Sequence, residues 1–182
     1  MSHRHRLSPL LLAGLGMAVL PAVAPAQTIP PACRPPIEAE KKVLMTPNHA
    51  YTTERPARAS GQPTTHEVIS AGGAMYILQN GSWRRSPLTT QAALEQLEQN
   101  LTDTKQYSCR HVGDETVNGV PAAVYVAHSE TEDLKADART WVATGSGLVL
   151  RTEEDLDTGN GDKRHISIRY EYANVHVPAG VR

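Results

Sequence analysis

Turn signals between β-prone segments dominate the C-terminal part of the chain, residues 109–178. Two Asn-Gly pairs, Asn118-Gly119 and Asn160-Gly161, separate runs rich in Val, Ile, Thr and Tyr, and a Gly-Ser-Gly turn at 145–147 lies between them. Asn-Gly is the strongest short hairpin signal, because a type I′ turn requires a positive φ at both central residues. The stretch therefore predicts consecutive antiparallel hairpins.

The first 26 residues have the organisation of a secretory signal peptide. Arg4 and Arg6 precede an apolar run over 7–23, and an Ala-Pro-Ala cleavage site ends at Ala26. An uncleaved membrane anchor is the weaker alternative, because prolines interrupt the apolar run. We expect cleavage after Ala26, a periplasmic location, and no transmembrane span in the mature chain. The remainder divides into a Pro-rich leader at 27–36, predicted to be extended, and a single domain at 37–182.

The two cysteines and the charge balance limit the chemistry of the mature chain. Cys33 and Cys109 are the only cysteines, and in an oxidising compartment we expect them to form a disulfide. They lack the close spacing that a zinc site needs. Without Arg4 and Arg6, the 18 basic residues fall to 16 against 19 acidic ones, a formal charge of −3. Nucleic-acid binding is not expected, because it requires a basic patch.

Two amphipathic helices are predicted upstream of the hairpins. The first covers 37–45, with acidic residues before basic ones, as the helix dipole favours. The second opens at Ser86-Pro87, with Pro in its first turn. Its apolar stripe is expected to pack into the core and comprises Ala93, Leu94, Leu97 and Leu101.

Short strands fill the space between these helices. We expect strands at 49–55 and 63–71, followed by a hairpin in which 74–79 pairs with 82–86 across Asn80-Gly81. Together with the C-terminal hairpins this gives about eight or nine strands, with too little helix between them for parallel crossovers. The predicted fold class is α+β: a curved antiparallel sheet, or half-barrel, with two helices packed across its concave face.

No catalytic or metal-binding motif is found. The Gly-Ser-Gly turn lacks the frame of a nucleophile elbow, and the acidic stretch at 155–162 fails the EF-hand pattern because Ile166 stands where the bidentate Glu belongs. The six histidines after residue 26 show no ligand spacing. We therefore predict a non-enzymatic protein with no catalytic residue, no metal site and no cofactor.

Apolar faces of the strands are the remaining candidate site. A curved antiparallel sheet with helices across its mouth leaves a concave apolar pocket. The residues predicted to line it for ligand binding are Met75, Ile77, Val124, Val126, Leu148, Leu150, Ile166, Ile168, Tyr170 and Tyr172.

The order of several short segments resembles exported half-barrel proteins related to the LolA/LolB lipoprotein carriers and their lipid-binding lipoprotein cousins. The resemblance extends from about His66 to Pro178 and rests on Tyr76, residues 80–83, 113–119, Tyr125, 141–142, 147–151 and 170–175. It implies antiparallel strands wrapped around helices, with an apolar cavity that holds acyl chains in some members and serves protein contact in others. The chain departs from this pattern in having no Phe to line a cavity.

Two functional hypotheses follow from the predicted fold and the resemblance. The first is a periplasmic carrier-like protein that binds a lipid or other hydrophobic ligand. The alternative is an envelope protein-interaction or sensor module whose half-barrel is filled by its own side chains. The expected partners are accordingly a hydrophobic small molecule or an envelope protein.

Overall fold

The computed structural model describes residues 29–56, 62–159 and 162–181. The predicted signal peptide and the Asn160-Gly161 turn lie outside these ranges. The described residues form one 3₁₀ turn, two α-helices and nine strands: η1 (Pro31–Cys33), α1 (Arg34–Met45), β1 (Asn48–Pro56), β2 (Thr64–Ala71), β3 (Ala74–Gln79), β4 (Ser82–Thr89), α2 (Thr90–Asp103), β5 (Gln106–Val117), β6 (Val120–Glu130), β7 (Lys135–Ala143), β8 (Val149–Asp157) and β9 (Lys163–Glu171).

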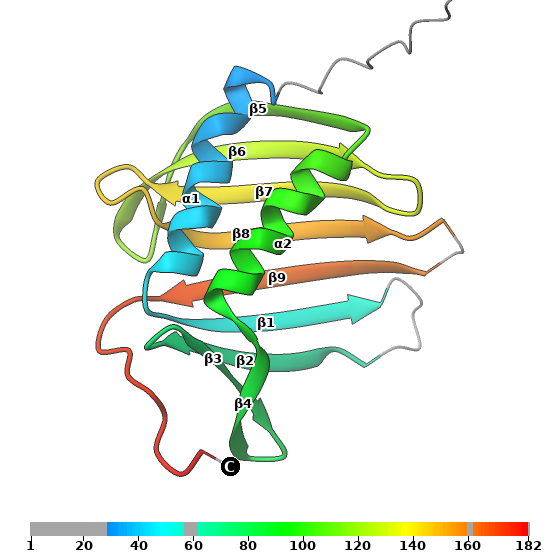
Figure 1. The fold of residues 1–182 in the computed structure, drawn as a ribbon. Helices are drawn as coiled ribbons and strands as arrows, with labels where there is room; N and C mark the ends of the chain where they lie inside the picture. Colours follow the sequence, from blue (N-terminus) through cyan, green and yellow to red (C-terminus); the bar gives the residue numbers. More distant parts are fainter. Residues whose placement is uncertain (1–28, 57–61, 160–161, 182) are drawn as a thin grey trace, which may run out of the picture.

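All nine described strands belong to one open antiparallel sheet, in the order β4-β3-β2-β1-β9-β8-β7-β6-β5. The chain enters the sheet at its middle, runs from β1 out to β4, crosses back along α2, and then returns by hairpins from β5 to β9. Both helices lie across the same face of the sheet (Figure 1). The α+β half-barrel prediction is confirmed. We call the face that carries the helices the inner face and the opposite one the outer face.

The Asn-Gly hairpins form as predicted wherever the structure describes them. Asn80 and Gly81 have φ angles of 50° and 72° and join β3 to β4, while Asn118 and Gly119 have φ angles of 50° and 83° and join β5 to β6. Both pairs thus have the positive φ values that a type I′ turn requires.

Two predicted boundaries are wrong, and proline explains both. The leader is predicted to be extended, but η1 covers Pro31–Cys33 and α1 already begins at Arg34. Prolines fit a first helical turn, where no N–H partner is needed. Pro87 belongs to β4 rather than to α2. β4 is an edge strand, which tolerates a missing N–H. α2 begins at Thr90, after Thr89 caps it by accepting a hydrogen bond from the Ala92 N–H at 3.1 Å.

The inner core lies beneath α1. Ala39 and Val43 of the helix pack against Val142 and Val149 of the sheet, all four buried, with Tyr125, Tyr170 and Tyr172 around them. α2 differs, because none of its residues is buried. The expectation that its apolar stripe packs into the core is therefore wrong: α2 packs against α1 and β4 and leaves space between itself and the strands.

The outer face carries two further apolar clusters. One consists of Ile69, Ala71, Ala74 and Tyr76, covered by Trp83 and by Val175 and Val181 of the C-terminal segment. The other consists of Ala122, Val124 and Trp141, with Val117 and Leu150 packed against them. Among the described residues no helix is long and apolar enough to cross a membrane.

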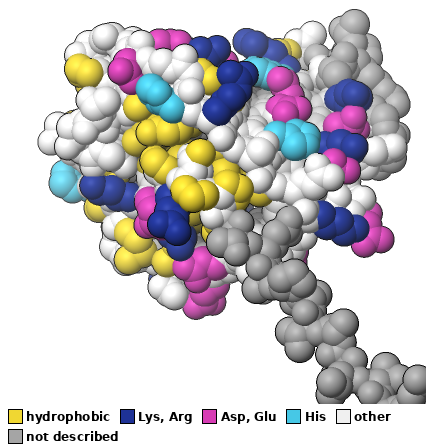
Figure 2. Space-filling view, turned by 90° about the horizontal axis from the view of Figure 1, so that it is seen from above, with side chains coloured by type: hydrophobic (Ala, Val, Ile, Leu, Met, Phe, Trp, Pro, Cys, Tyr) yellow, Lys and Arg dark blue, Asp and Glu magenta, His cyan; other side chains and the backbone are white. Residues whose placement is uncertain are grey.

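Seen from the β5 end of the molecule, hydrophobic side chains gather in the middle of the surface, with charged side chains around them (Figure 2). β5 is one of the two edges of the sheet, so it has a neighbouring strand on one side only. This end of the molecule therefore combines an open strand edge with an apolar surface.

Candidate ligand-binding cavity

A cavity of about 470 Å³ lies between α1, the C-terminal half of α2 and the inner face of β5–β8. Its walls come from every one of these elements. The lining residues are Pro36, Glu40, Leu97, Asn100, Leu101, Asp103, Thr104, Tyr107, Tyr125, Ala127, Ser129, Thr131, Leu134, Ala136, Ala138, Thr140 and Glu154.

Small side chains on adjacent strands form the floor of the cavity. Ala127 of β6 pairs with Ala138 of β7, and Ser129 pairs with Ala136. Residues directly opposite each other in an antiparallel pair have side chains on the same face. Four small side chains therefore meet in one patch of the inner face, and the volume that larger residues would fill stays open.

The roof and the rim come from α2 and from the loop after β6. Leu97 and Leu101 lie on α2 and contribute apolar surface. Leu134 is held by a tight turn, in which the Thr131 N–H donates to the Leu134 carbonyl at 2.8 Å and the Leu134 N–H donates to Thr131 Oγ1 at 3.2 Å. The C-terminus of α2 is fixed to the sheet by Lys105, whose N–H donates to the Glu130 carbonyl at 2.8 Å.

Two glutamates bring carboxyl groups into this space. Glu40 extends from α1 and Glu154 from β8, and both are half-buried. Burial, together with the charge of Glu154, raises the pKa of Glu40 from its ordinary 4.5 to about 7. Burial also raises the pKa of Glu154. The pKa of the Tyr107 hydroxyl is raised by burial and by the two nearby carboxylates, so this tyrosine stays a neutral hydrogen-bonding group.

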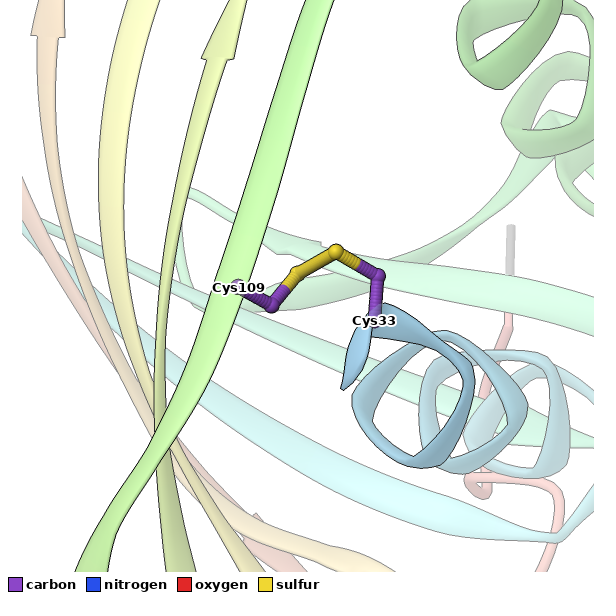
Figure 3. The surroundings of a disulfide bond; sticks show 2 residues. All are labelled: Cys33 and Cys109. Atoms are coloured by element: carbon purple, nitrogen blue, oxygen red, sulfur yellow. A yellow bond between two sulfur atoms is a disulfide. The ribbon is translucent and has the colours of Figure 1, made fainter. Parts of the chain in front are cut away.

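A disulfide fixes α1 over this end of the sheet. Cys33 and Cys109 are bonded with a Cα–Cα distance of 5.0 Å across a sequence separation of 76 residues, which confirms the predicted pairing (Figure 3). The bond joins the start of α1 to β5, the edge strand, and Pro36 and Tyr107 beside it line the cavity. Such a bond is typical of proteins that fold in an oxidising compartment.

The strand register divides the ten predicted ligand-binding residues between the two faces. Six lie on the helix-covered side: Met75, Ile77, Ile166, Ile168, Tyr170 and Tyr172. Val124, Val126 and Leu150 point to the outer face, and Leu148 lies between β7 and β8. None of the ten is among the residues that line the cavity.

The sequence pattern of β6 explains why the lining residues were missed. Val120, Ala122, Val124 and Val126 form the more hydrophobic alternation, and it faces outward. The second alternation contains Tyr125 and Ala127, which line the cavity. Both faces of β6 are apolar because both are covered, so hydrophobicity alone does not distinguish them. The signal that identifies the inner face is the small residue repeated at 127, 136 and 138.

The outer face also has a depression, of about 580 Å³, lined mainly by β5–β9. Its polar groups are paired with one another across the strands: His128 Nδ1 lies 2.9 Å from Asp137, and His165 Nδ1 lies 2.8 Å from Asp155. Within the described ranges no group of three or more His, Cys, Asp or Glu side chains is arranged to hold a metal ion. The inner cavity is the better candidate, because Glu40 and Glu154 are half-buried whereas Asp137 and Asp155 of the outer depression are exposed, and because aliphatic side chains line the inner cavity.

The arrangement of one curved antiparallel sheet around two helices is the one implied by the resemblance to the LolA/LolB carriers. The described residues thus form an open half-barrel of the kind that this resemblance implies (Figure 1). No family model and no curated protein matches the sequence. Among solved structures, LprF from Mycobacterium bovis is similar at 8% identity and a TM-score of 0.42, over 84% of this chain and 98% of that one.

Two further solved structures are similar at the same level. The lipoprotein LppX of Mycobacterium tuberculosis has 11% identity and a TM-score of 0.39, over 81% of this chain and 96% of its own. MucB in complex with MucA(peri) has 17% identity and a TM-score of 0.44, over 81% of this chain and 60% of MucB. Similarity of this degree concerns the fold and assigns neither a ligand nor a partner.

Proposed function

We propose that this protein is an exported, non-enzymatic carrier-like protein that binds a lipid or another small hydrophobic molecule in the cavity beneath α2. The observation that carries the proposal is the open space itself. Its volume of about 470 Å³ falls within the range of about 300–1,000 Å³ typical of ligand pockets. The disulfide supports a periplasmic location.

Aliphatic and aromatic side chains provide the binding surface. Leu97, Leu101 and Leu134 lie around the cavity together with Tyr107 and Tyr125. Each buried CH₂ group of a ligand contributes about 0.8 kcal/mol, so a ten-carbon chain gains about 8 kcal/mol before the cost of association is subtracted. We expect dissociation constants in the micromolar range or weaker for a simple chain of this length.

The test uses the neutral fluorescent probe N-phenyl-1-naphthylamine and the disulfide-bonded protein. The wild type should enhance its fluorescence saturably. Ala138→Trp fills the floor of the cavity and should reduce this binding at least tenfold. Gln96→Trp adds the same side chain on an exposed position of α2 and should leave binding unchanged. Circular dichroism verifies that both variants are folded.

Native mass spectrometry of protein purified from a periplasm complements the probe. A co-purified hydrophobic molecule would support the proposal. If the wild type carries no such molecule and no probe binds, ligand carriage is wrong. If folded Ala138→Trp binds the probe as the wild type does, the cavity is not the site.

The apolar surface at the β5 end favours a second function, an envelope protein-interaction module. Val112 of β5 has 37% of its surface exposed, beside an open strand edge to which an extended peptide can add. Val112→Lys should then weaken binding of an envelope partner without affecting the probe. A partner whose affinity is unchanged by Val112→Lys would argue against this surface.

A further inference from the structure

The charges that line the cavity are all of one sign. Glu40 comes from α1, Asp103 from α2 and Glu154 from β8, while none of the lining residues is Lys, Arg or His. A fatty acid or phosphate-bearing lipid whose head group entered this cavity would find no cation among the lining residues to pair with. The lining of this cavity opposes such ligands instead, because their negative charge would meet the acidic groups of Glu40 and Glu154 with no basic side chain beside them.

The two glutamates have no cation among the described residues. No ion pair within the described ranges involves Glu40 or Glu154. Lys41, next to Glu40 in sequence, instead reaches Glu98 of α2 at 3.2 Å. Asp103 differs, because it accepts hydrogen bonds from Gln99 Nε2 at 3.0 Å.

The titratable groups that face Glu40 are acidic or neutral on every element around it. Glu154 lies on β8, Tyr107 on β5 and Tyr170 on β9, and all three interact electrostatically with it. Asp103 of α2 lines the same cavity. A carboxylate in such surroundings either takes up a proton or requires a positive partner, because burying an unpaired charge is costly. Burial and the charge of Glu154 raise the pKa of Glu40 to about 7, so proton uptake is the alternative to a positive partner.

We propose that the ligand of this cavity is a cationic amphiphile, with an ammonium or guanidinium group between Glu40 and Glu154 and an apolar body against Leu97, Leu101 and Leu134. This inference rests on the proposed function, since it names the class of ligand for the same cavity. The faces of Tyr107 and Tyr125 add a second attraction, because a cation near a tyrosine ring is stabilised by the charge distribution of the ring.

The first test compares three ten-carbon probes by isothermal titration calorimetry at pH 8, each below its micellar concentration. Decyltrimethylammonium should bind at least tenfold more tightly than decanol, and decanoate should bind most weakly. Glu40→Gln should remove most of the preference for the cation while decanol binds as before. Glu38→Gln makes the same change on an exposed position of α1 and should have no effect.

The second test uses the wild type alone and measures the pH dependence of binding and the number of protons released. A cation binds the ionised form of Glu40, so its affinity should fall as the pH is lowered through about 7 and approach a tenfold loss per pH unit below it. Near pH 6 binding should release up to one proton, seen as a difference in heat between phosphate and imidazole buffers. The decanol affinity should stay constant.

Each result separates the two proposals. If decanol binds and the cation shows no preference, no proton release and no response to Glu40→Gln, the cationic-ligand inference is overturned while ligand carriage stands. If none of the three probes binds, ligand carriage itself fails. Tighter binding of decanoate than of the cation would also overturn the inference.

Discussion

Replacing the Glu40 carboxyl group by an amide in Glu40→Gln should abolish the pH dependence that this residue gives to stability. The folded-state pKa of Glu40 is about 7, against an ordinary value of 4.5. The folded protein therefore binds this proton more tightly than the unfolded chain does. The stabilisation from Glu40 is fully present below about pH 4.5 and is lost as the pH rises through about 7.

The size of the effect follows from the same values. Each pH unit of difference in pKa corresponds to about 1.4 kcal/mol, so raising the pKa from 4.5 to about 7 corresponds to about 3 kcal/mol between acid and mildly alkaline pH. This figure is an upper bound, because the cavity has room for water that solvates the carboxylate. We expect Glu40→Gln to be more stable than the wild type by about 1–3 kcal/mol at pH 8 and similar to it at pH 4.

Urea unfolding at pH 4, 6, 7 and 8, followed by tryptophan fluorescence with the disulfide intact, measures this difference. Glu38→Gln is the matched control, since it is exposed on the same helix, and its unfolding curve should run parallel to that of the wild type at every pH. Two results would refute the reasoning about a buried, unpaired carboxylate. One is a Glu40→Gln variant that is less stable than the wild type at pH 8, and the other is a difference in unfolding free energy that is the same at all four pH values.

Two further predictions concern the framework of the fold. Replacing both Cys33 and Cys109 by Ser should lower the unfolding free energy by about 2–4 kcal/mol, because the disulfide closes a long loop of the unfolded chain; equal urea midpoints for variant and wild type would contradict this. Val124→Ala should cost about 2 kcal/mol, since Val124 is fully buried beneath Trp141, whereas Val126→Ala should cost less than about 1 kcal/mol at its half-buried position. If thermal unfolding shows the same loss of stability for both variants, the prediction that burial in the outer cluster makes Val124 the more important residue is wrong.

Those parts of the fold that depend on local chemistry could be predicted from the sequence. Asn80-Gly81 and Asn118-Gly119 form hairpin turns, because few other residue pairs tolerate the backbone conformation that the turn requires. The Cys33–Cys109 pairing also follows from the sequence, since no other cysteine competes. The start of α2 cannot be predicted from the sequence, because Pro87 fits an edge strand as well as a first helical turn. Only the sheet order shows that β4 is an edge strand.

The candidate site depends on packing that no local pattern reports. Val124 is buried on the outer face because Trp141 covers it, and Trp141 is held there by Glu115, which accepts a hydrogen bond from its indole N–H at 2.8 Å. These residues come from three different strands. Glu40 is one of the charged residues of the predicted amphipathic helix at 37–45, and it becomes a cavity residue because α1 lies against the inner face of the curved sheet (Figure 3). The curvature of the sheet therefore decides which polar residue becomes a cavity group.

The two helices differ in a way that bears on how a ligand reaches the cavity. α1 is anchored by a disulfide and buries Ile37, Ala39 and Val43, whereas α2 buries no residue and joins α1 through a partly exposed Lys41–Glu98 pair. An element with few buried apolar contacts is displaced at a lower free-energy cost than one with many, and an exposed ion pair adds little to hold it. Of the two helices, α2 is therefore the one that is less costly to displace. Glu40 lies on the anchored helix and the lining leucines Leu97 and Leu101 lie on α2, so the polar and apolar parts of the cavity differ in how firmly they are held.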